Sequence, residues 1–169
     1  MKPAVFFDRD GVLNQDIGYL YRPEDFVWTD GAREAIRLCN ERGYYVFVVT
    51  NQSGVARGYY EERDVIALHN WMQGELAADG AHIDAFYHCP HHPEGKVPQY
   101  KAACTCRKPA PGLILQAARD WPVDLAHSFI IGDNPGDVEA GRAAGIKGYL
   151  FAGKNLYTFV QTILNQPEE

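Results

Sequence analysis

The sequence contains no apolar run long enough to cross a bilayer. Its first apolar stretch is short and no small-residue cleavage site follows it, so we expect no signal peptide and no membrane partner, and we expect the chain to work in the cytoplasm. Positive charge is also scarce, because 16 Lys and Arg residues face 22 Asp and Glu residues, for a net charge of -6. That balance disfavours nucleic acid as a partner, since phosphate backbones are bound by surplus Lys and Arg. An acidic protein can still bind an anionic substrate through a local cationic site or a metal.

Internal repeats and low-complexity segments are absent as well. With 169 residues, of which 46% are hydrophobic, the chain suits a single domain, residues 1–169, around one core. There are only four cysteines. In a reducing compartment we expect them to be metal ligands or core residues rather than disulfides.

Apolar runs and helix-periodic segments alternate along the chain. The pattern predicts strands at 5–7, 45–49, 85–87, 129–131 and 149–151, and helices at 32–39, 65–76, 113–121, 138–144 and 156–164. Such alternation is typical of an α/β fold, a parallel sheet with helices on both faces. No insertion between these elements is large enough for a separate cap domain. In sheets of this kind ligands bind beyond the carboxyl ends of the strands.

Three predicted strands end in polar residues that a core would not need: Asp8-Arg9-Asp10-Gly11, Thr50-Asn51-Gln52-Ser53-Gly54, and Gly132-Asp133-Asn134 with Asp137 one turn on. Asp8 and Asp10 are two positions apart, so their side chains leave an extended segment on the same side. Like charges that close need a cation, or one must hold a proton. Mg²⁺ with oxygen ligands meets the first need, and Asp133 can add a carboxylate. The alternative is that these are ordinary loop acids, which their joint placement at strand ends disfavours.

Four motifs in this order resemble those of the haloacid dehalogenase-like phosphatases, and the resemblance spans essentially the whole chain: Asp8-x-Asp10-Gly11, Thr50-Asn51, Lys108-Pro109 and Gly132-Asp133-x-x-x-Asp137. The resemblance implies a Rossmann-like three-layer sandwich and a phospho-aspartyl intermediate. A carboxylate nucleophile divides phosphate-ester hydrolysis into two displacements, and cations must neutralise the transferring phosphoryl group.

The same resemblance implies a role for each motif residue. Asp8 is the expected nucleophile and Asp10 the general acid/base. Thr50 and Lys108 hold the phosphoryl group. Magnesium is expected on Asp8, Asp133 and the Asp10 carbonyl, with Asp137 touching a direct ligand of the ion or reaching the ion through a water molecule.

A cluster of cysteine and histidine lies between the second and third motifs. Cys89-Pro90-His91-His92 is followed by Cys104-Thr105-Cys106, and three thiolates with one imidazole suit a tetrahedral structural Zn²⁺ in a loop of residues 89–106. A disulfide is the alternative, although Cys104 and Cys106 are too close for an easy bridge; another is that the histidines are plain surface groups. Spacing leaves His91 and His92 open, and the resemblance favours His91. Zinc here would fix Arg107 and Lys108 at the site.

Cys39 does not belong to this cluster. It falls on the apolar face of the predicted helix 32–39, so we interpret it as a core residue.

A zinc loop in this position is shared by two groups of the family, the heptose bisphosphate 7-phosphatases and the histidinol-phosphatases. The segment 51–58, the run Cys89-Pro90-His91-His92-Pro93 and the segment Asp16-Ile17-Gly18-Tyr19 resemble the heptose group. The resemblance implies removal of the 7-phosphate from D-glycero-D-manno-heptose 1,7-bisphosphate, in making nucleotide-activated heptose for lipopolysaccharide or S-layer glycan. It implies that substrate is bound by Asp16, Gly18, Tyr19, Asn51, Gln52, Ser53, Arg57, Arg107 and Asn134.

Two of these positions have particular chemistry. Arg57 and Arg107 can bind the second phosphate, because a guanidinium matches phosphate geometry. Some members of the group have Lys where this chain has Asn134, which donates a hydrogen bond but carries no charge.

The sequence alone leaves other functions open. Histidinol-phosphatase and a phosphatase for another sugar or nucleotide are alternatives within enzymes, and a zinc-stabilised binding module that lost its chemistry is an alternative outside them. The intact set of motif residues argues against the last. We expect a monomer whose partner is a small phosphorylated sugar.

Overall fold

A five-stranded parallel sheet forms the centre of the computed structural model, which describes residues 1–167. The strand order is β3-β2-β1-β4-β5, with β1 Ala4–Phe7, β2 Tyr45–Asn51, β3 Ala85–Cys89, β4 Phe129–Gly132 and β5 Lys147–Leu150. Val5 of the central strand pairs with Val46 on one side and Phe129 on the other. All four residues of β1 are buried, as expected for a strand covered on both faces. The predicted α/β class is confirmed.

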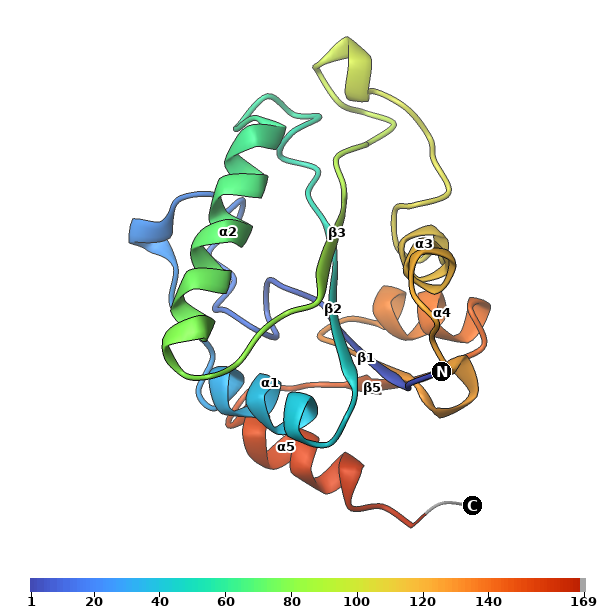
Figure 1. Ribbon diagram of the computed structural model, residues 1–169. Helices are drawn as coiled ribbons and strands as arrows, with labels where there is room; N and C mark the ends of the chain where they lie inside the picture. Colours follow the sequence, from blue (N-terminus) through green and yellow to red (C-terminus); the bar gives the residue numbers. More distant parts are fainter. Residues whose placement is uncertain (168–169) are drawn as a thin grey trace.

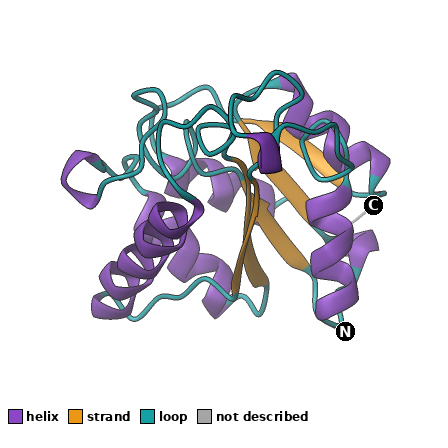
Figure 2. Cartoon of the chain, turned by 90° about the horizontal axis from the view of Figure 1, so that it is seen from above, coloured by secondary structure: helices purple, strands orange, loops and turns teal. Residues whose placement is uncertain are grey.

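Helices cover both faces of this sheet (Figures 1 and 2). They are α1 Ala32–Glu41, α2 Glu62–Ala78, α3 Gly112–Asp120, α4 Pro135–Ala143 and α5 Leu156–Leu164. Side chains alternate along β1, so Val5 and Phe7 pack into a core with residues of α1, α2 and α5, whereas Ala4 and Phe6 pack into a second core with residues of α3 and α4. The result is a three-layer sandwich.

Several predicted boundaries differ from the observed ones, among them the start of α2 at Glu62 rather than 65, and two of the differences have a clear local reason. Helix α4 begins at Pro135 rather than at 138, because the Asn134 side chain accepts a hydrogen bond from Gly136 N and caps the helix there. Strand β5 spans Lys147–Leu150 rather than 149–151, since its place at the sheet edge does not require an apolar run. Phe151 follows it and packs into the core beside Phe159.

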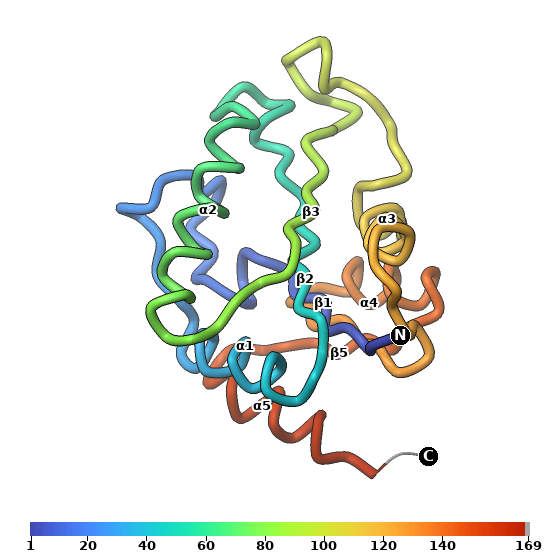
Figure 3. The backbone as a smooth tube through the Cα atoms, viewed as in Figure 1, coloured from blue at the N-terminus to red at the C-terminus, as the bar shows by residue number. Residues whose placement is uncertain are grey.

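Loops at the carboxyl ends of the strands surround the region where ligands are expected. Residues 90–111 make the longest excursion, at the top of the view in Figure 3, and residues 52–61 lie next to it. Backbone hydrogen bonds join the two segments, because Lys96 N and Val97 N both donate to Ala56 O, at 2.7 and 2.9 Å. Between residues 1 and 167, no helix combines the length and apolarity that a membrane span requires.

Candidate active site

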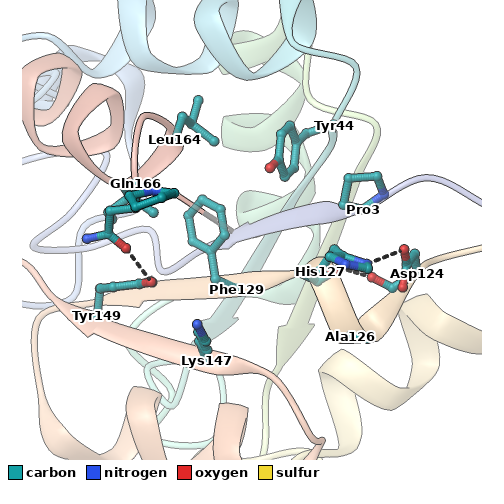
Figure 4. Close-up of a pocket in the computed structure, with 13 residues that line it drawn as sticks. Pro3, Tyr44, Asp124, Ala126, His127, Phe129, Lys147, Tyr149, Leu164 and Gln166 are labelled. Carbon is teal, nitrogen blue, oxygen red and sulfur yellow. Dashed lines mark hydrogen bonds and ion pairs between the residues drawn. The ribbon is translucent and has the colours of Figure 1, made fainter. Parts of the chain in front are cut away.

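The structure contains hollows at both ends of the sheet. The larger, about 790 Å³, lies at the amino ends of the strands and is lined by residues such as Phe129, Lys147 and Tyr149 (Figure 4). The smaller, about 400 Å³, lies at the carboxyl ends of the strands. It is lined by the predicted site residues Asp8, Asp10, Asp16, Asn51, Arg107, Lys108, Asp133, Asn134 and Asp137, together with Pro109 and Gly136. Four separate segments of the chain meet there, as strand-end placement predicted.

Lys108 is the cation at the centre of this hollow. Its buried Nζ donates to Asp8 Oδ1 at 2.9 Å, to Asp137 Oδ1 at 2.5 Å and to the Val49 carbonyl at 2.9 Å. Burial alone would lower the pKa of Lys108, but the two carboxylates outweigh burial and raise it, so the amine stays charged. Asp137, expected near magnesium, therefore contacts Lys108 directly.

Negative charge in the hollow exceeds what Lys108 can neutralise. Burial raises the pKa of Asp8 to about 7, with Lys108 opposing the rise and Asp137 adding to it. Burial also raises the pKa of Asp133, and Asp137 adds to that rise while a hydrogen bond with Asp8 opposes it. One ligand oxygen from each of these three carboxylates lies within 4.8 Å of the others. Such a set of oxygen donors fits Mg²⁺.

Two glycines make this arrangement of carboxylates possible. A Cβ on Gly11, whose φ is +89°, would lie 2.0 Å from Asp133 Oδ2. A Cβ on Gly132 would lie 2.1 Å from Asp137 Cβ. Any larger residue at either position would push a carboxylate out of place.

Asp10 lies apart from the other acids and has its own cation. Its Oδ1 accepts hydrogen bonds from Arg9 Nε at 3.1 Å, Arg9 Nη2 at 3.0 Å and Asn14 Nδ2 at 3.0 Å, and its Oδ2 accepts one from Gln52 Nε2 at 3.2 Å. Each of these two acids therefore lies beside a cation that the chain itself supplies. Lys108 forms an ion pair with Asp8, and Arg9 forms one with Asp10.

Residues at the end of β2 and just after it hydrogen-bond to the Lys108 peptide and to one another. Asn51 brackets the Lys108 peptide, because its Nδ2 donates to Lys108 O at 3.2 Å and its Oδ1 accepts from Lys108 N at 3.0 Å. The peptide bond between Lys108 and Pro109 is cis. Gln52 is buried and donates to Thr50 Oγ1 at 2.9 Å. Thr50, Gln52 and Ser53 are not among the residues that line the hollow.

The segment expected to bind substrate is brought to the hollow only in part. Asp16 lines it, and its Oδ1 accepts a hydrogen bond from Gly18 N at 3.0 Å. Gly18 and Tyr19 both have positive φ, 78° and 53°, which turns the half-exposed Tyr19 ring against Tyr59 at a centroid distance of 4.7 Å. Asn134 lines the hollow while its Oδ1 caps α4.

Arg57 and Arg107 come together around His92. Arg57 Nη2 lies 3.4 Å from His92 Nε2, and burial together with both guanidinium groups lowers the pKa of that imidazole. Arg57 Nε and Arg107 Nη1 are buried and have no hydrogen-bond partner within the described part of the chain. Unpaired buried donors on two cations are the signature of a place for an anion.

The predicted thiol cluster is assembled next to this site. Cys106 Sγ lies 2.8 Å from Cys89 Sγ and 3.2 Å from Cys104 Sγ, and His91 Nδ1 lies 3.6 Å from Cys89 Sγ and 3.4 Å from Cys106 Sγ. Cys89, Cys104 and Cys106 are free thiols, so the disulfide alternative is wrong. His91 joins the cluster, whereas His92 faces Arg57, as the resemblance favoured. Three thiols and an imidazole with no carboxylate among them fit Zn²⁺.

Known proteins resemble this chain over most of their length. A family model described as HAD-hydrolase-like matches residues 105–155. The D-glycero-beta-D-manno-heptose-1,7-bisphosphate 7-phosphatase of Rhodopseudomonas palustris is 52% identical over 163 residues, which cover 96% of this chain and 91% of the relative. This chain belongs to the heptose-1,7-bisphosphate 7-phosphatase family of haloacid dehalogenase-like hydrolases.

Other members of the family are also similar to this chain over most of its length. The D-glycero-alpha-D-manno-heptose-1,7-bisphosphate 7-phosphatase of Burkholderia mallei is 47% identical over 85% of this chain and 76% of that protein. The D,D-heptose 1,7-bisphosphate phosphatase of B. bronchiseptica, solved with magnesium and phosphate, superposes with a TM-score of 0.80 at 34% identity, over 99% of this chain and 89% of that one. The family therefore contains relatives named for each anomer.

Sequence reasoning missed the residues that surround Asp10. Arg9 and Asn14 hydrogen-bond its carboxylate, and Tyr60 and His69 hydrogen-bond the side chains that do so. Arg9 could have been noticed, because it stands between two site acids. Tyr60 and His69 carry no local signal, since they reach Asp10 only through the fold.

Proposed function

We propose that this chain is a phosphomonoester hydrolase that removes the 7-phosphate of D-glycero-D-manno-heptose 1,7-bisphosphate. The observation that carries the proposal is the group of Asp8, Asp133 and Asp137 around Lys108 in the hollow. Carboxylates with one buried cation suit a bound metal and a transferring phosphoryl group. Membership of the heptose-1,7-bisphosphate 7-phosphatase family supports the choice of substrate.

In the proposed reaction, Asp8 Oδ attacks the phosphorus of the 7-phosphate and forms an aspartyl phosphate. Lys108 and Thr50 bind the phosphoryl oxygens, and Asp137 keeps Lys108 charged and aimed at them. Magnesium, held by Asp8, Asp133 and the Asp10 carbonyl, would supply charge neutralisation at the phosphoryl oxygens. Asp10 protonates the leaving sugar oxygen and then takes a proton from the water that attacks the aspartyl phosphate.

Arg57 and Arg107 are the proposed contacts for the 1-phosphate. Their buried, unpaired N–H groups can donate to an anion that lies at the edge of the hollow. Asp16, Gly18, Tyr19, Ser53 and Asn134 would then contact the sugar, whereas Asn51 and Gln52 act through Lys108 and Asp10. An Arg107→Gln variant should raise the KM for the bisphosphate more than the KM for a heptose 7-monophosphate. Equal changes would remove Arg107 from the 1-phosphate contact.

A structural zinc is the proposed centre of the loop 89–106, because four protein ligands leave no position for water. It would order a loop that is only partly buried and so place Arg107 and Lys108. We further propose one domain over residues 1–169 without a separate cap, acting as a monomer in the cytoplasm, where the free thiols stay reduced.

Phosphate release from a panel of substrates tests the proposal. The panel contains both anomers of the heptose bisphosphate, histidinol phosphate, a nucleoside monophosphate and p-nitrophenyl phosphate, each with and without magnesium. The heptose bisphosphate should give the highest kcat/KM, and chelation of magnesium should abolish the activity. Preference for histidinol phosphate or a nucleotide would reassign the substrate. No release from any compound, by folded and metal-loaded protein, would leave only a binding role.

A further inference from the structure

Arg9 is the most deeply buried charged residue near the site. Its side chain has no exposed surface, and its guanidinium makes three hydrogen bonds to the two oxygens of Asp10, at 3.0 to 3.2 Å. A buried guanidinium is costly unless its N–H groups are paired. A planar fork over a carboxylate also restricts the rotation of that carboxylate.

The other donors of Arg9 reach two more segments. Nη2 donates to the Leu20 carbonyl at 2.9 Å, at the end of the segment that begins with Asp16. Nη1 lies 3.3 Å from His69 Nε2 on α2. Burial and the adjacent Arg9 hold the pKa of His69 well below its usual range, so the ring is neutral and its Nε2 accepts. Arg9 thus ties Asp10 both to the segment 16–20 and to the helical layer.

A second chain of hydrogen bonds reaches Asp10 from the opposite side. Burial raises the pKa of Tyr60 to about 12, so its hydroxyl keeps its proton and donates to Gln52 Oε1 at 2.6 Å. With Oε1 used as an acceptor, Gln52 Nε2 must be the group that donates to Asp10 Oδ2 at 3.2 Å and to Thr50 Oγ1 at 2.9 Å. Tyr60 belongs to the segment 52–61, which contacts the loop 90–111.

We infer that Arg9 and the pair Tyr60–Gln52 are positioning residues that hold the Asp10 carboxylate for proton transfer. Both oxygens of Asp10 have partners, yet its side chain keeps 23% of its surface exposed and lines the hollow. Through these hydrogen bonds the segments 16–20 and 52–61 both set where this carboxylate lies. The inference rests on the proposed role of Asp10 as general acid/base.

The test compares leaving groups in single-turnover formation of the aspartyl phosphate. A heptose 7-phosphate needs a proton on its leaving oxygen, whereas p-nitrophenyl phosphate does not, so only the first reaction depends on Asp10 in this step. Misplacing a catalytic group by about 1 Å can cost around a hundredfold. Arg9→Lys should therefore slow the heptose reaction roughly a hundredfold, and Tyr60→Phe roughly tenfold. Both should change the p-nitrophenyl reaction by less than about threefold, because nitrophenolate leaves unprotonated.

Tyr100→Phe is the matched control. Tyr100 packs in the same small cluster as Tyr60, but its hydroxyl donates to Glu62 Oε2 at 3.0 Å and has no link to Asp10. Neither substrate should react more slowly in this variant. If Arg9→Lys does not fold, Tyr60→Phe decides the question, because it removes a single hydroxyl.

Equal losses on the two substrates, or no loss on either, would overturn the positioning role. Failure of the proposed function would look different: without phosphatase chemistry the unsubstituted protein would form no phosphoenzyme with p-nitrophenyl phosphate, and with another substrate the substrate panel would show the preference. If the unsubstituted protein gives a normal burst but the variants lose equally on both substrates, or on neither, the positioning role is rejected and the proposed function is not.

Discussion

The two ligand clusters of this protein differ in what holds them together. Asp8, Asp133 and Asp137 stand at the ends of β1 and β4 and at the start of α4, so the register of a parallel sheet and a capped helix place them. Lys108 forms ion pairs with Asp8 and Asp137. Only Cys89 of the thiol cluster stands on a strand.

The other three members of the thiol cluster, His91, Cys104 and Cys106, come from a loop and gather around Cys89 and one another. Sheet register therefore determines the carboxylate cluster, whereas the thiol cluster depends on the path of a loop, which a bound metal would fix. The predictions below test this contrast, from the largest expected effect to the smallest.

Asp8→Asn should abolish turnover while leaving the fold and the thiol cluster intact. An amide has the shape of the carboxylate but is a very poor nucleophile, so we expect activity below about a hundredth of the unsubstituted rate. Lys108 keeps its 2.5 Å partner Asp137, and the buried cation is not left alone. Steady-state kinetics and a thermal melt check both parts. Activity above that level, or a collapsed melt, would contradict the assignment of Asp8.

Asp10→Asn should slow the reaction with a heptose 7-phosphate by about 10²–10⁴, the usual contribution of general acid/base catalysis. Because Asp10 lies apart from Lys108 and is paired with Arg9, binding of magnesium should change little. Single-turnover rates with alkyl and aryl phosphates give the measurement. A similar loss on both in the phosphorylation step would mean that Asp10 does not act as an acid there.

Cys104→Ser should cost about a hundredfold in turnover and should also lower the thermal midpoint. Loss of one ligand frees the loop, and Arg107 and Lys108 follow Cys106 directly, so a catalytic cation moves. Added magnesium should rescue neither property. Elemental analysis of protein purified without added metal should find one zinc per chain before substitution and much less after it. Absence of zinc from the unsubstituted, fully active protein would refute the structural zinc.

Cys39→Ala is the matched cysteine control and should have the smallest effect. Cys39 lies in the α1 side of the core, away from the other thiols, and burial raises its pKa to about 12. Its removal should lower the free energy of unfolding by about 1 kcal/mol, a typical value for a point substitution. Zinc content and kcat should stay unchanged. Loss of zinc in this variant would show that the ligand set is misassigned.

Hydrophobic periodicity determined the strands and helices of this chain, because each side chain faces the core according to its own position in the element. The strand-end acids could be predicted for the same local reason. The predicted start of a helix was wrong where a capping side chain determines its first residue, as Asn134 does for α4. Of the residues around Asp10, Arg9 was marked only by its place between two acids, and Tyr60 and His69 were not marked by any local pattern.

Tertiary structure decided how the acids share their cations. Asp8 and Asp10 are two positions apart, yet Lys108 arrives beside one from a distant loop, and Arg9 turns to the other. The sequence determined which groups meet at the edge of the sheet, because strand order and length are local properties. Which cation pairs with which carboxylate depends on hydrogen bonds that Leu20 and His69 accept from Arg9 and that Gln52 donates to Asp10, and only folding brings those groups within 3.3 Å of one another.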